Sequence, residues 1–102
     1  MKTVYSITHN DYLIELKMLG DFVFLYVNNI EQNFSVFRRK VLLSYSDTDS
    51  IQISLKRPHF SKQWKLTVLF NNEMIDEKLL TSTGTIISSE TTTKKNGVFI
   101  KR

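Results

Sequence analysis

Apolar and polar residues alternate along several short segments of the chain, as they do in a β-strand with one buried face. The clearest segment is 12–18, where nearly every second residue is apolar, and similar alternation recurs at 41–45, 51–55 and 64–70. A spacing of about eight to twelve residues between such runs is typical of antiparallel sandwiches and barrels. We therefore expect one all-β domain over residues 1–102, an antiparallel β-sandwich or squat barrel of about seven to nine strands.

The stretch 34–45 fits two patterns. Phe34, Phe37 and Val41 have the spacing of one helix face. If the stretch is extended, its apolar positions change from even to odd numbers across residues 38–40, and a β-bulge would explain the change. We favour strand, bulge and strand over a helix.

Asparagine pairs mark the expected hairpin turns. Asn28-Asn29 and Asn71-Asn72 each follow an apolar run, and Asn tolerates the positive φ angles of a type I′ turn. Asn96-Gly97 is the strongest signal of this kind and predicts a hairpin near the C-terminus.

A faint internal repeat includes the first two of these turns. Leu16-Lys17 and the run Phe22–Val27 recur as Leu55-Lys56 and Lys65–Phe70, each run being followed by an Asn pair. Two such strand–loop–hairpin units could supply two sheets that bury their apolar faces on each other. Duplication and chance similarity among hairpins both explain the match.

The first hairpin carries a candidate binding surface. If Asn28-Asn29 is a regular two-residue turn, one face of the hairpin pairs apolar with apolar residues and belongs to the core. The other face carries a stripe of three aromatic residues: Phe22, Phe24 and Tyr26. Across the hairpin, the stripe would face three polar residues: Ser35, Asn33 and Glu31. Such a stripe is a common anchor for a partner protein, unless another segment such as residues 58–60 covers it.

The same reasoning places the single tryptophan in the core. With Asn71-Asn72 as a two-residue turn, Trp64 faces Leu79 and Val68 faces Ile75, which is apolar pairing on both positions. We therefore expect Trp64 to anchor the core rather than to bind a ligand.

Composition supports strands and excludes several kinds of protein. The chain has no Ala, but it has 26 Val, Ile and Thr residues and 12 aromatic residues, which favour a pleated sheet. The absence of Cys excludes a disulfide framework, thiol catalysis and cysteine-bound zinc. Without an apolar run of about 18 residues or a signal peptide, we expect a cytoplasmic protein with no membrane partner.

Catalytic and metal-binding chemistry finds little support in the sequence. His9 and His59 lie in different segments without a convincing catalytic triad, and we expect both to be surface loop residues. Residues 47–50, Asp-Thr-Asp-Ser, alternate oxygen ligands, but they lack the glycine and distal glutamate of an EF-hand loop and read as a polar turn. The three glycines are scattered, so no phosphate-binding loop is present. We expect no enzymatic activity, no cofactor and no metal.

Charge supplies an alternative function. The net charge is +4, with −1 on residues 1–51 and +5 on residues 52–102. A basic half favours nucleic acid or an acidic partner. The candidate nucleic-acid-binding residues form two groups: Lys56, Arg57, Lys62 and Lys65, and Lys94, Lys95, Lys101 and Arg102. Lysines on edge strands also serve simply to block edge-to-edge pairing.

The sequence thus predicts a small, non-enzymatic, intracellular binding module that engages a partner protein through the aromatic stripe or an exposed strand edge. Residues with AT-rich codons outnumber those with GC-rich codons by 40 to 8, which indicates an AT-rich genome such as that of a phage, a mobile element, a large DNA virus or a low-GC bacterium. Such an origin favours an accessory protein, of the kind found in phages and viruses, that modulates a host factor. The alternative is a nucleic-acid-binding protein. Uncapped edge strands would also allow a homodimer.

Overall fold

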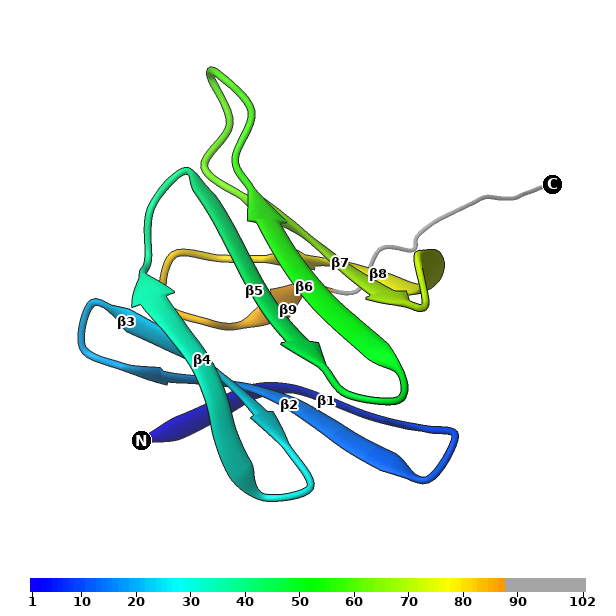
Figure 1. Ribbon diagram of the computed structural model, residues 1–102. Coiled ribbons are helices and arrows are strands. Elements are labelled where there is room, and N and C mark those ends of the chain that lie inside the picture. The colour runs from blue at the N-terminus through cyan, green and yellow to red at the C-terminus, as the bar shows by residue number, and fades with distance from the viewer. Residues whose placement is uncertain (88–102) are drawn as a thin grey trace, which may run out of the picture.

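Two antiparallel sheets make up the part of the chain described by the computed structural model, residues 1–87 (Figure 1). The first sheet contains β1 (Lys2–His9), β2 (Tyr12–Leu19), β3 (Phe22–Val27) and β4 (Ile30–Val36). The second sheet contains β5 (Lys40–Ser46), β6 (Ser50–Lys56), β7 (Trp64–Phe70), β8 (Glu73–Leu80) and β9 (Ile86–Ile87). The predicted antiparallel sandwich is confirmed, with nine strands in these residues.

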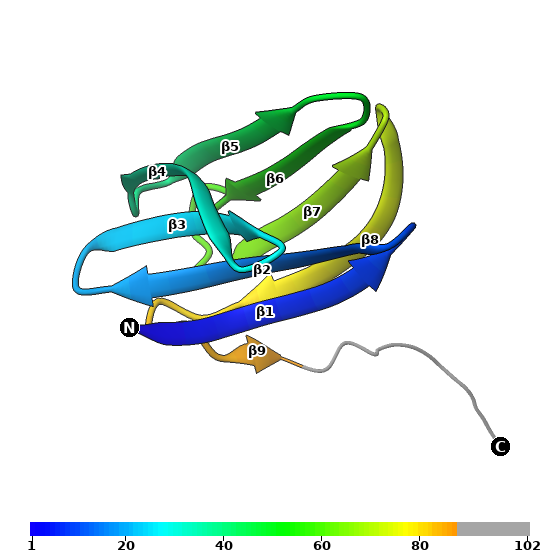
Figure 2. The same cartoon turned by 60° about the horizontal axis from the view of Figure 1, so that its bottom comes forward.

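Within each sheet, the spatial order of the strands is their order in the chain, so that every strand pairs with its sequence neighbour. The two sheets lie face to face in the view of Figure 2. Alternate side chains point inward and are buried, because apolar residues occupy every second position of these strands. The fully buried side chains from both sheets form one core: Ile14, Leu16, Val23, Leu25, Leu43, Ile51, Ile53, Leu55, Leu66, Val68 and Leu80.

Two tyrosines link the sheets through polar contacts. The Tyr5 hydroxyl on β1 donates a hydrogen bond of 2.7 Å to Asp76 on β8, and the Tyr12 hydroxyl on β2 donates one of 3.0 Å to Asp49. Burial, together with the hydrogen bond and the charge of Asp76, raises the pKa of Tyr5 above its ordinary value. The hydrogen bond to Asp49 is the main cause of a raised pKa at Tyr12. Both phenols are therefore held in the neutral form.

The predicted Asn-Asn turns are confirmed. Asn28 and Asn71 have φ of 51°, and the asparagine after each has φ of 68°, as a type I′ turn requires. The sequence analysis missed a third turn of this kind at Asn10-Asp11, with φ of 48° and 68°. Asp also tolerates this conformation, but an Asn-Asp pair is a weaker signal than Asn-Asn or Asn-Gly. The Asn96-Gly97 turn lies outside the described residues.

The two Asn-Asn hairpins share more than their turns. In each hairpin, the third residue after the turn, Gln32 or Ile75, has no partner across the ladder and forms a β-bulge. In each, the side chain of the first turn asparagine accepts a hydrogen bond from a neighbouring strand: Asn28 from the Leu13 amide at 2.8 Å, and Asn71 from the Ser50 amide at 2.9 Å. The hairpins are therefore structurally equivalent.

The strand that precedes each hairpin is not aligned as the sequence repeat suggested. Leu16 pairs with Leu25 on β3, and the residue equivalent to Leu25 in the second hairpin is Val68, which pairs with Ile53. The structural counterpart of Leu16 is thus Ile53, and the match of Leu16-Lys17 to Leu55-Lys56 is wrong by two residues. A shift of two residues preserves the inward face, which is why the sequence pattern did not reveal it.

The segment between residues 34 and 45 is neither a helix nor one bulged strand. β4 ends at Val36, residues 37–39 carry the chain from the first sheet to the second, and β5 begins at Lys40. The apolar positions change parity because the chain passes from one sheet to the other, so the predicted bulge is a crossover. A backbone hydrogen bond of 2.7 Å from the Phe37 amide to the Asp21 carbonyl fixes the start of this crossover.

Candidate functional site

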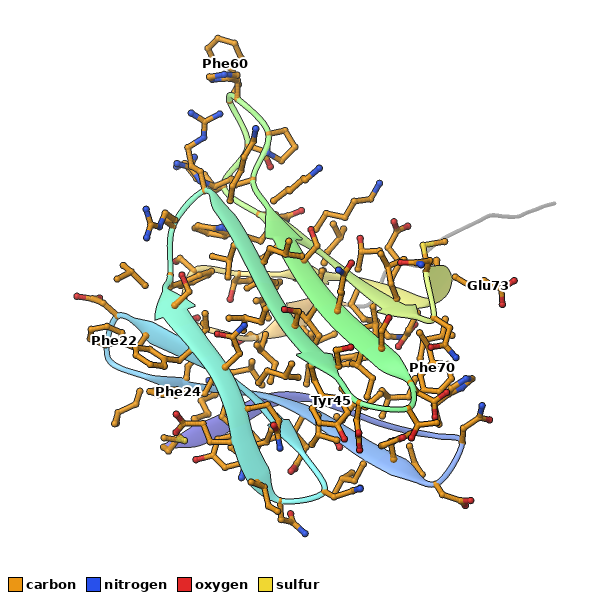
Figure 3. All side chains as sticks on the ribbon, in the orientation of Figure 1. Phe22, Phe24, Tyr45, Phe60, Phe70 and Glu73 are labelled. Carbon is orange, nitrogen blue, oxygen red and sulfur yellow. The ribbon has the colours of Figure 1, made fainter. Side chains whose placement is uncertain are left out.

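The aromatic stripe lies on the outer face of the first sheet. On β3, Val23, Leu25 and Val27 point inward and are buried, so strand alternation directs Phe22, Phe24 and Tyr26 outward. Figure 3 shows Phe22 and Phe24 on this side of the sheet, and 43% of the Phe22 surface is exposed. Phe24 and Tyr26 are half-buried. The predicted division of β3 into a core face and an outer face is confirmed.

The polar partners predicted for the stripe are wrong in two of three cases. Because of the bulge at Gln32, Phe24 faces Phe34 instead of Asn33, and Phe22 faces Val36 instead of Ser35. Only Tyr26 has its predicted partner, Glu31. The Phe24 and Phe34 rings are stacked with their centroids 5.8 Å apart, and the Phe22 and Phe34 centroids are 6.4 Å apart. The stripe is therefore part of a wider apolar surface.

Strand β2 extends this surface on the other side. Leu19 pairs with Phe22, so that Leu19, Phe22 and Val36 form a continuous apolar row across three strands. The exposed fractions of Leu19, Phe34 and Val36 are 54%, 53% and 42%. We call the following five residues the apolar outer face: Leu19, Phe22, Phe24, Phe34 and Val36. Sequence reasoning missed Phe34 and Val36 because it assumed a regular β3–β4 hairpin without a bulge, and it missed Leu19 because it did not assign the pairing of β2 with β3.

Charged side chains border the apolar outer face at Tyr26. The Lys17 ammonium group lies 4.4 Å from the centroid of the Tyr26 ring, and it is 4.0 Å from the Glu15 carboxylate. A cation over an aromatic ring is attracted by the electron-rich face. Tyr26 is thus covered by a charged neighbour and forms the margin of the surface rather than its centre.

The loop containing residues 58–60, which the sequence left as a possible cover for the aromatic stripe, does not lie over it. Residues 57–63 connect β6 and β7 and project beyond the second sheet, with Phe60 at the tip (Figure 3). Phe60 is fully exposed. The alternative that residues 58–60 shield the stripe is therefore wrong.

A second surface gathers basic side chains at one end of the second sheet. Lys40, Lys56 and Lys65 are directly paired across β5, β6 and β7 and are all exposed. Seven residues of the crossover, these strand ends and the 57–63 loop form what we call the basic end: Arg38, Arg39, Lys40, Lys56, Arg57, Lys62 and Lys65. The structure thus brings the first predicted basic group together with three residues that sequence reasoning had read only as a bulge. Lys94, Lys95, Lys101 and Arg102 lie outside the described residues.

Trp64 anchors the basic end. It is 9% exposed, which confirms its predicted place in the core, although its partner across the hairpin is Leu80 rather than Leu79. Because of the bulge at Ile75, the predicted pairing of Val68 with Ile75 is also wrong, and Val68 faces Asp76. The Trp64 indole N–H donates a hydrogen bond of 2.9 Å to the Arg38 carbonyl, and its ring lies 5.2 Å from the Arg57 guanidinium carbon. These contacts tie the crossover to the base of the 57–63 loop.

The remaining candidate residues have structural contacts. His59 is an exposed loop residue as predicted, whereas His9 is the half-buried last residue of β1, so its predicted place in a loop is wrong. The His9 ring packs against Phe70 with its centroid 4.6 Å away, and one His59 ring nitrogen lies 3.1 Å from an Arg39 guanidinium nitrogen. Both Asp49 carboxylate oxygens accept hydrogen bonds, one from Tyr12 and one from Asn71 at 3.0 Å. Within residues 1–87, no three His, Asp or Glu side chains converge as a metal ion would require, and no helix could span a membrane.

The two surfaces described above differ in chemistry, since one is apolar and the other cationic. Comparisons with known proteins add no third indication: no family model, no curated protein and no solved structure matches this chain. The chemistry of these two surfaces is therefore the basis on which a function can be argued.

Proposed function

We propose that this chain is a small binding protein that engages a partner protein through the apolar outer face. The observation that carries this proposal is the apolar row Leu19–Phe22–Val36, with Phe34 stacked beside it on Phe24. Four of these five residues are among the nine large apolar residues that the structure exposes within residues 1–87. Grouped apolar exposure is far less common on a monomer than scattered exposure, and it marks interaction surfaces.

The geometry of this face suits recognition. The side chains stand on three hydrogen-bonded strands, so the surface is already formed and loses little conformational freedom on binding. Burying an aromatic side chain completely contributes about 1.5–3 kcal/mol, and the exposed parts of Phe22, Phe34 and Leu19 give the face room for several such contributions.

The surroundings of the face indicate the chemistry of its partner. Val36 at the end of β4 leads through Phe37 into Arg38 and Arg39, and Asp21, whose carbonyl accepts a hydrogen bond from the Phe37 amide, lies at the same margin. A complementary surface would have apolar side chains at its centre and polar groups of both charges at that margin. We propose a host-cell protein as the partner, because the AT-rich codon usage favours an accessory protein, and the cytoplasm as the location.

A paired set of variants tests the proposal. Phe22→Ser with Phe34→Ser removes two exposed rings from the apolar outer face, whereas Leu42→Ser with Met74→Ser removes two side chains exposed to 61% and 60% on the second sheet. Immobilised wild-type and variant proteins are incubated with nuclease-treated host extract, and the retained protein is purified and titrated calorimetrically. We expect at least tenfold weaker binding for the first pair and unchanged binding for the second.

Equal retention by all three proteins would contradict the proposal. Sedimentation of the chain alone, at several concentrations, identifies a second copy of the chain as the partner if association is lost in the Phe22→Ser, Phe34→Ser variant only.

A further inference from the structure

We propose that the basic end, together with Phe60, binds a single-stranded nucleic acid, with the cations on the phosphates and the Phe60 ring stacked on a base. This site adjoins the apolar outer face only through Arg38 and Arg39, and it does not depend on the function proposed for that face.

Charge is segregated along the long direction of the strands. The turns β1–β2, β5–β6 and β7–β8 meet at one end of the sandwich, where the Tyr12–Asp49 and His9–Phe70 contacts lie (Figure 2). That end carries carboxylates: Asp11, Asp47, Asp49 and Glu73. The crossover and the 57–63 loop, which carry the basic end, lie at the opposite end, where the seven cations outnumber the neighbouring Asp21. A field of this kind draws a polyanion to one end of the molecule.

The basic end contains like charges that fold stability alone does not explain. Lys40 faces Lys56, and Lys56 faces Lys65, on strands that are spaced by about 4.8 Å. Like charges directly opposite each other destabilise a sheet. Of the seven cations, Lys65 alone has an ion pair within residues 1–87, with Glu77 at 3.3 Å. A chain of phosphates would neutralise this cluster and release its counterions.

Phe60 provides a surface on which a base could stack. It is fully exposed and has φ of 65°, which is an outlier for a bulky residue. The loop that holds it is braced, because the Arg57 guanidinium donates a 2.9 Å hydrogen bond to the Ser61 carbonyl and lies over Trp64. Aromatic side chains among cations are the usual platform for unpaired bases.

The tip of the loop favours a thread-like ligand over a membrane. Beside it, Arg38, Arg39, Lys40 and His59 line an open hollow of about 560 Å³. The neighbours of Phe60 in the loop are His59 and Ser61, so the tip offers a single apolar side chain for insertion. A base inside a duplex is already stacked, and Phe60 therefore selects a single strand.

Fluorescence anisotropy of a labelled 12-nucleotide poly-dT strand tests this site, with titrations of the full chain between 50 and 200 mM salt. Lys40→Gln with Lys56→Gln removes two charges from the basic end, and Lys2→Gln with Lys17→Gln removes two from the first sheet as a matched control. We expect the first pair to weaken binding and to flatten the slope of log K against log salt by about 1.4, since each lost phosphate contact contributes about 0.7. The control pair should leave the slope unchanged.

Variants of Phe60 test the stacking. Asn tolerates the positive φ at this position, so Phe60→Asn keeps the loop conformation but removes the ring. We expect binding at least fivefold weaker for Phe60→Asn and unchanged for Phe60→Trp. Four results would overturn the proposal: no salt-dependent binding by the wild-type chain, equal losses in both lysine pairs, unchanged binding by Phe60→Asn, or binding to anionic phosphatidylserine vesicles without binding to poly-dT.

Discussion

The outer faces of the two sheets differ, although their inner faces follow the same alternation. Across the first sheet, the row Leu19–Phe22–Val36 is apolar on all three strands. Across the second sheet, Leu42 on β5 is followed by Ser54, Thr67 and Glu77 on the next three strands. The second sheet shows that a stable sheet of this fold does not need outward-facing aromatics. The outward-facing aromatic residues of the first sheet are therefore not a requirement of the fold, and they indicate another role.

The largest effect on stability is expected from a substitution in the core, where the inner faces of the two sheets meet. Trp64→Ala should lower the free energy of unfolding by about 3–5 kcal/mol, because truncating a large aromatic leaves a cavity in a packed site. Urea denaturation of the variant, compared with Leu42→Ala on the exposed face, measures the difference. Native tryptophan emission should be blue-shifted, since Trp64 is 9% exposed. A small loss of stability would mean that the inner faces are as tolerant as the outer ones.

A smaller effect is expected where the sheets are joined by the Tyr5–Asp76 hydrogen bond of 2.7 Å. Tyr5→Phe should cost about 1–3 kcal/mol at pH 7. The raised pKa keeps Tyr5 neutral in the folded protein above pH 10, where a tyrosine in the unfolded chain loses its proton. The unfolded state then binds fewer protons, so stability falls with rising pH, by up to about 1.4 kcal/mol per pH unit from this group.

Urea denaturation at pH 7, 10 and 11 checks this dependence. The difference in stability between wild type and Tyr5→Phe should narrow as the pH rises, because the variant lacks this titration. A constant difference across the three pH values would argue that Tyr5 titrates alike in both states.

A still smaller effect on stability is expected when aromatic residues are removed from the outer face of the first sheet. Phe22→Ser with Phe34→Ser should change the free energy of unfolding by less than about 1 kcal/mol, since about half of the surface of each residue is exposed to water already. Binding of a fluorescent hydrophobic dye should fall at the same time. A loss above 3 kcal/mol would assign the apolar outer face to the core and remove it as an interaction surface.

The smallest effect on stability is expected when apolar residues are added to the outer face of the second sheet, the reverse of removing them from the first. Ser54→Leu with Thr67→Leu extends the exposed Leu42 into an apolar row on the second sheet, like the row on the first. The change in stability should stay within about 0.5 kcal/mol, while dye binding and self-association, followed by light scattering, rise. If neither rises, apolar exposure on a sheet of this fold is not sufficient to make it adhesive.

The sequence predicted what depends on local alternation and turn chemistry. The inward residues of β3 follow from the alternation of apolar and polar residues along a strand. The Asn-Asn turns follow from the tolerance of Asn for positive φ. The bulge at Gln32 could not be foreseen, because no residue type in the hairpin marks it. One inserted residue was enough to exchange Asn33 for Phe34 opposite Phe24.

The candidate surfaces were predictable only in part for a related reason. The stripe on β3 is local, but Leu19 joins it through pairing between strands. The basic end depends on still longer connections, since Arg38 in the crossover and Arg57 in the loop are brought together by the buried Trp64 ring and its hydrogen bond. Charge counting found the basic half of the chain but not the place where its cations meet.

The order of the strands has a consequence for how the chain folds. Each sheet is encoded by one uninterrupted stretch, 2–36 for the first and 40–87 for the second, and every ladder joins neighbours in sequence. Pairing of this kind is fast, since hairpins close in about 1–10 μs and local contacts shorten the search. We therefore expect the docking of the two sheets across their inner faces to be the slower step. A chain cut between Arg38 and Arg39 would leave each fragment with a whole sheet, and the fragments should reassociate into the native sandwich when mixed.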